Sequence, residues 1–137
     1  MKKAILLVVS LVCVLAAGFA LGVYALPILT APTAPTLAET SLAASQSIYK
    51  GEFRRDLKDS DALHWGQGTV NVGSKSIAFT GKLAPGPDYK LYLSPEFVET
   101  EKDFARLKPQ MKRIGDVRTF ENFVVPVPES IDVSQYK

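Results

Sequence analysis

The chain has 137 residues, 47% of them hydrophobic, and its 16 Lys and Arg residues against 14 Asp and Glu residues give a formal net charge of +2. This balance provides no electrostatic footprint for nucleic acid, so nucleic acid is excluded as a partner. Because the chain has a single cysteine, it can form neither an internal disulfide nor a metal site built from several thiolates.

An uncharged and mostly apolar run extends from Ala4 to Leu26, directly after Lys2-Lys3. At about 1.5 Å per residue, a helix of this length crosses a hydrocarbon core of roughly 30 Å. Residues 1–26 are therefore predicted to be a single-pass membrane anchor, with the two lysines inside and the rest of the chain outside the cytoplasm. A signal peptide cleaved near Val23-Tyr24-Ala25 is the alternative. Cys13 is interpreted as a small apolar residue of the membrane helix.

Residues 27–47 are rich in Pro, Thr, Ala and Ser, and Glu39 is their only charged residue. Proline disfavours helix, and the segment has too few large apolar side chains to build a core. It is therefore predicted to be a semi-extended spacer, with a short helix over residues 36–45 as the alternative.

Residues 48–137 are predicted to form one small β domain, because apolar and polar side chains alternate in several short segments. The second and third strands form a hairpin in which Val70, Val72, Ile77 and Phe79 face one core. The predicted strands are Tyr49–Arg54, Gly68–Val72, Lys75–Thr80, Tyr89–Ser94, Ile114–Phe120 and Phe123–Val127.

The connecting segments differ in character. Gly81–Pro87 is predicted to be a loop, and Glu96–Lys112 a charged excursion with a helical turn, closed by Pro109. Ile131–Tyr136 is expected to begin a further strand. Short strands with frequent turns and almost no helix indicate an all-β fold, either a small antiparallel β-sandwich or a partly open barrel, preceded by the transmembrane helix.

Four segments of the domain follow one another in a recognisable order: YKGEF at 49–53, HWGQGTV at 64–70, IAFTGKLAPGPDYKLYLSP at 77–95 and RIGDVRTFENFVVPVPESIDVSQYK at 113–137. Together they resemble the DM-thirteen (electron transfer DM) family of small extracytoplasmic β domains. The residues that carry the resemblance are Gly51, Phe53, His64, Gly68, Gly86, Pro87, Asp88, Tyr92 and Leu93.

The resemblance also implies a departure from the family. In that family the last segment leads into a strand with a Trp-Cys pair, and the cysteine is the basis of a proposed redox or haem-binding role. The sequence stops at Lys137, which implies either a shortened member or an incomplete sequence, and a sheet with an exposed edge. Cys13 is not the equivalent of the family's cysteine.

His64 is the candidate cofactor-binding residue, because a neutral imidazole suits haem iron or another metal. No second ligand stands at a suitable spacing, so the preferred interpretation is a histidine at the rim of the sheet, hydrogen-bonded to backbone, with Trp65 as a packing residue. Asp61 and Asp88 are a candidate pair of carboxylates, although turn chemistry explains Asp88. No metal site and no catalytic residue is predicted.

These observations predict a membrane-tethered domain in the periplasm or at the cell surface that is not an enzyme. It is expected to act as a binding or accessory module, linked to electron transfer, with the membrane and an envelope protein as partners and without a cofactor of its own. The alternative is a haem-binding redox carrier that uses His64 and a cysteine beyond the end of this chain.

Overall fold

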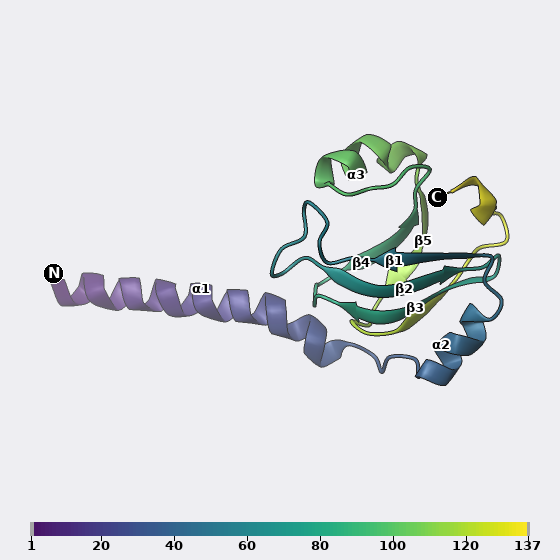
Figure 1. Ribbon diagram of the computed structural model, residues 1–137. Helices are drawn as coiled ribbons and strands as arrows, with labels where there is room; N and C mark the ends of the chain where they lie inside the picture. The colour runs from purple at the N-terminus through teal and green to yellow at the C-terminus, as the bar shows by residue number, and fades with distance from the viewer. Residues whose placement is uncertain (1, 137) are drawn as a thin grey trace.

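The computed structural model describes residues 2–136 and contains an N-terminal helix followed by two antiparallel sheets (Figure 1). The elements, in chain order, are α1 (Lys2–Thr30), α2 (Leu37–Ala44), β1 (Tyr49–Phe53), β2 (Gly66–Val72), β3 (Ser76–Leu83), β4 (Tyr89–Leu93), α3 (Glu101–Leu107), β5 (Lys112–Val117) and β6 (Phe123–Pro126). Single turns of 3-10 helix occupy Lys108–Gln110 and Val133–Gln135.

Helix α1 is long and apolar enough to cross a membrane, and it projects away from the sheets (Figure 1). It continues past the predicted end at Leu26 to Thr30, with Pro27 inside its last turns. A proline there removes only one backbone hydrogen bond. The Thr30 hydroxyl also donates to the Leu26 carbonyl at 2.8 Å, which stabilises the extra turn.

The segment between α1 and β1 is not a plain spacer, and the alternative of a short helix is confirmed. Thr36 and Glu39 form a capping box at the start of α2, because the side chain of each accepts a hydrogen bond from the other's backbone amide. Helix α2 packs against β3, and Thr40 is completely buried. The local capping signal therefore outweighs the proline-rich composition that predicted an extended chain.

The larger sheet has the strand order β1-β2-β3-β6, and the smaller sheet pairs β4 with β5. In the predicted hairpin, Val70 lies opposite Phe79 and Val72 lies opposite Ile77, so all four side chains face the core as expected. The prediction of a loop from Gly81 is wrong for its first three residues, because β3 continues to Leu83. Pairing with Gly66–Gly68 of β2 and a 2.9 Å bond from the Leu83 amide to the Phe120 carbonyl hold this extension.

One hydrophobic core receives side chains from both sheets, and no closed barrel forms among the described strands. Phe79 of β3 is completely buried at its centre, and its ring lies 4.9 Å from Phe123 and 5.1 Å from Phe53, measured between centroids. Leu93 of β4 and Ile114 of β5 reach the same cluster from the smaller sheet. Antiparallel sheets preceded by an apolar helix were predicted, and that part of the fold is confirmed.

Three details of the C-terminal half correct the predicted elements. The strand predicted over Ile114–Phe120 spans Lys112–Val117 instead, and it pairs with β4, whereas β6 pairs with β3. The helical turn after β4 is confirmed as α3, but Pro109 lies within the following 3-10 turn instead of ending the helix. The expected strand near Val133 is also a 3-10 turn, because the Asp132 carboxylate caps it by accepting from the Ser134 amide at 3.0 Å.

Candidate functional site

An apolar cleft lies along the edge of β4 that has no strand partner in the described part of the chain. The four-stranded sheet is wider than the two-stranded one, so the strands β1 and β2 are not fully covered. Two adjoining cavities of about 400 and 540 Å³ result. These volumes fall within the range of small-molecule sites. Both cavities are lined by Phe53, Gly66, Leu91, Tyr92, Ser94 and Val98.

Aromatic rings dominate the walls of the smaller cavity. They are Phe53 of β1, Trp65 just before β2, Tyr89 and Tyr92 of β4, Phe104 of α3 and Phe123 of β6. Tyr92 and Phe104 pack edge to face with centroids 5.6 Å apart. The hydroxyl of Tyr89 donates to the Ala84 carbonyl at 2.8 Å, and burial raises the pKa of its phenol. Flat walls of this kind suit a planar ligand.

Two polar groups in the cavity wall, the Lys90 ammonium group and the Ser94 hydroxyl, differ in whether they already have interaction partners. Lys90 pairs with Asp88 and, at 3.1 Å, with Asp116, and these carboxylates raise the pKa of its ammonium group. Its charge is thereby compensated. The Ser94 hydroxyl oxygen is buried and has no hydrogen-bond partner among the described residues. A buried hydroxyl without a partner is costly, so it is the group in the cleft most in need of a hydrogen bond.

His64 lies at the mouth of the smaller cavity and is exposed. Its Nδ1 is 3.0 Å from Asp61 Oδ2, whereas Asp61 Oδ1 accepts the backbone amides of Leu63 and His64 at 2.6 and 2.7 Å. The expectation that the His64 ring bonds to backbone is therefore wrong, because the nearby carboxylate takes its place. Asp61 and Asp88 do not act as a pair, since Asp61 holds His64 and Asp88 holds Lys90.

The carboxyl group of Asp61 should titrate below its usual range. Hydrogen bonds from the His64 ring, then from the Leu63 and His64 amides, lower its pKa. A carboxylate with a depressed native pKa stabilises the fold above its usual pKa of about 3.9, and this contribution is lost as the pH falls through the native value.

We expect the amide NMR signals of Leu63 and His64 to shift with a common midpoint below about pH 3.9. The variant Asp61→Asn should abolish this transition, because no titrating group then accepts the two amides. A midpoint at or above the usual value would contradict the assigned hydrogen bonds.

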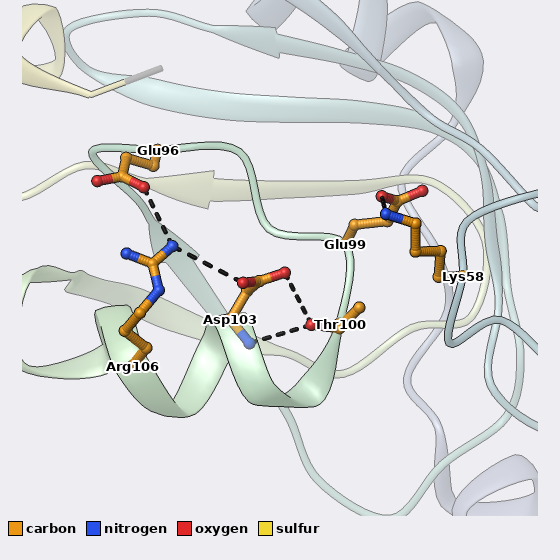
Figure 2. A network of polar contacts seen from close by, with 6 residues as sticks. All are labelled: Lys58, Glu96, Glu99, Thr100, Asp103 and Arg106. Carbon is orange, nitrogen blue, oxygen red and sulfur yellow. Dashed lines mark hydrogen bonds and ion pairs between the residues drawn. The ribbon is translucent and has the colours of Figure 1, made fainter.

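A set of polar contacts fastens the β1–β2 loop to the segment between β4 and α3 (Figure 2). Lys58 pairs with Glu99 at 2.9 Å. Asp59, which is not drawn, accepts the Glu101 amide at 2.6 Å. The Thr100 hydroxyl caps α3 by accepting the Asp103 amide at 3.1 Å. Arg106 completes the set with Glu96 and Asp103. Because both fastened segments line the larger cavity, these contacts hold its walls together.

The residues that suggested the family fall into two groups. Phe53, His64 and Tyr92 line the smaller cavity, and Gly51 and Leu93 line the larger one. The others shape the strands and turns around the cleft. Gly86 is one of these, because a β-carbon there would lie 2.7 Å from the ring of Tyr89. The remaining members are Gly68, Pro87 and Asp88.

Sequence reasoning missed Ser94 and Phe104 as cleft residues. Alternation along the predicted strand Tyr89–Ser94 places Ser94 on the face opposite Leu91 and Leu93, and Phe104 falls within the predicted charged excursion Glu96–Lys112. The one available signal was Phe104 itself, a large apolar residue among charged neighbours. The cleft arises at the unpaired edge of β4, where residues from both faces of the strand become accessible.

The family model described as Electron transfer DM13 matches residues 52–137, more than half of the chain and nearly the whole sheet region. The match includes all of the cleft strands except the first part of β1. No curated protein and no solved structure matches this chain.

Proposed function

Because the chain belongs to the Electron transfer DM13 family, we propose that it is a membrane-tethered accessory module that binds an apolar, planar redox carrier in its cleft. Its domain lies outside the cytoplasm, and it presents the carrier to an envelope partner without catalysing a reaction of its own. The observation that carries this proposal is the aromatic cleft along the edge of β4, with a buried hydroxyl that has no hydrogen-bond partner within residues 2–136.

The chemistry of the walls selects the class of ligand. A charged ligand is disfavoured, because burying a charge requires an opposite charge, and Lys90 is already paired with two carboxylates. A quinone is neutral and planar, and its carbonyl oxygen accepts a hydrogen bond. Its ring can stack between Tyr92 and Phe53, and Ser94 can donate to one carbonyl.

Titration of the full chain in detergent with menadione, a simple naphthoquinone, tests the proposal. Trp65 lines the cleft and is the only tryptophan, so its fluorescence should be quenched with a saturable dependence on menadione. Ser94→Ala should weaken binding by up to about tenfold, the value of one hydrogen bond of roughly 0.5–1.5 kcal/mol. Ser74→Ala, at an exposed serine outside the cleft, is the matched control. Non-saturable quenching, or equal affinity in both variants, would sink the proposal.

The haem-binding alternative is favoured by one specific observation. Asp61 holds Nδ1 of His64, the arrangement in which a carboxylate orients a histidine ligand. No hydrogen bond within residues 2–136 occupies Nε2, so this nitrogen would be the one to bind haem iron. Haem added to the chain should then give a Soret band that His64→Ala removes and Asp61→Asn weakens. A spectrum unchanged by His64→Ala would eliminate this alternative.

A further inference from the structure

The short segment that follows α1 lies against the domain, although α1 itself has no buried residue among those described. A cavity of about 390 Å³ is bounded on one side by Ile28, Ala31, Pro32 and Ala34. Trp65 and Phe120 are among the residues that bound it on the domain side. This short connection therefore determines which face of the domain lies nearest the membrane.

Asn122 fastens this connection to the larger sheet. Its side-chain amide donates to the Pro35 carbonyl at 3.4 Å, and its side-chain oxygen accepts the Gly81 amide of β3 at 3.1 Å. Trp65 is held on the same part of the sheet, because its carbonyl accepts the Ala84 amide at 2.9 Å. One face of the domain thus contains Trp65, the end of β3 and the segment that follows α1. We call it the membrane-proximal face.

The depth of this face follows from the length of α1. With Lys3 at the inner surface, a core of about 30 Å takes about 20 residues and ends near Val23. Ile28 then lies about 7 Å further out, within a headgroup layer that is about 5–8 Å thick. Trp65, which bounds the same cavity as Ile28, is placed at that level.

The side chains near this face suit a headgroup layer. The Arg55 guanidinium lies 3.9 Å from the centre of the Trp65 ring, and Lys82 is exposed. Neither cation has a carboxylate partner within residues 2–136, although Glu121 lines the same cavity. Leu63, 59% exposed, belongs to the β1–β2 loop on the side toward which α1 projects (Figure 1). Tryptophan and arginine are typical of membrane interfaces.

We infer that the domain itself binds the bilayer surface through Trp65, Arg55, Lys82 and Leu63, which lie in the phospholipid headgroup layer. This inference rests on the proposed membrane tether and adds a second, protein-encoded contact with lipid. Trp65 also lines the cleft, so the mouth of the cleft opens at the membrane surface. An apolar carrier dissolved in the bilayer can then enter the cleft without crossing water.

Depth-dependent quenching of the full chain in phosphatidylcholine vesicles tests the inference. Trp65 is the only tryptophan, so its emission reports this face alone. A nitroxide on the lipid headgroup should quench Trp65 strongly, and a nitroxide deep in the acyl chain should quench it weakly. In the control, a flexible spacer of about 20 residues with a reach of roughly 25 Å is inserted between Thr30 and Ala31. Quenching by the headgroup label should persist, because the domain's own contacts with lipid keep Trp65 at that depth without the short connection to α1.

Flotation with the vesicles separates the two proposals. A chain that floats but shows no preference for the headgroup label overturns the inference and leaves the tether in place. Loss of headgroup quenching in the spacer variant also overturns it, because the tether alone would then set the depth of Trp65. A chain that does not float overturns the tether itself, and the inference with it.

Discussion

Replacing Phe79 by alanine is expected to lower the free energy of unfolding of the domain by about 3–5 kcal/mol. The ring is completely buried and stacks on Phe53 and Phe123, so its removal leaves a cavity where the two sheets meet. A small domain has a total stability of only about 5–15 kcal/mol, so this single change removes a large share of it.

Urea denaturation of the full chain in detergent, followed by Trp65 fluorescence, measures this loss. Phe97→Ala is the matched control, because its ring is 69% exposed and its truncation should change stability by no more than about 0.5 kcal/mol. Similar losses in the two variants would contradict the assignment of Phe79 to the centre of the core.

The second large effect is expected for Gly68→Ala, with a loss of about 2–5 kcal/mol from strain and overpacking together. Gly68 has φ of 151°, a backbone conformation that side chains disfavour. A β-carbon there would lie 2.3 Å from the Thr80 carbonyl oxygen and 2.7 Å from the α-carbon of Gly81, its partner across β2 and β3. Neither backbone atom can move without breaking the pairing.

Gly51→Ala serves as the control for this prediction. Its added β-carbon would meet only a methyl group of Val70, at 3.3 Å, and that side chain can shift slightly. Thermal unfolding of both variants should therefore show a large drop for Gly68→Ala and a small one for Gly51→Ala. If the two melting temperatures matched, β2 and β3 would not approach as closely as the structure shows.

Much of the fold was predictable because its signals are local. Alternation located all six strands to within a few residues, and the hairpin of β2 and β3 has the expected facing of Val70, Val72, Ile77 and Phe79. The errors occur where a partner distant in the sequence decides the outcome. Gly81–Leu83 is strand because it pairs with Gly66–Gly68, and the segment before β1 is ordered because α2 packs on β3.

The candidate site was predictable only in part. His64 is exposed as a rim residue should be, but its carboxylate partner Asp61 was found only in the structure. Alternation places Ser94 on the face opposite Leu93, but its hydroxyl oxygen is buried, and the β1–β2 loop and the segment after β4 line the same cavity. A local pattern of residue types cannot predict that two segments distant in the sequence lie beside the same cavity.

The amino-acid sequence by itself determined the apolar helix, the antiparallel character of the domain and its membership of the family. These depend on residue type and on periodicities of a few residues, which act locally. Only the tertiary structure decided that consecutive strands enter different sheets, that the sheets differ in width, and that Trp65 lies beside the end of α1. The physical reason is that the cleft and the membrane-proximal face are built from contacts between distant segments, whose free energy depends on the packing of the whole domain.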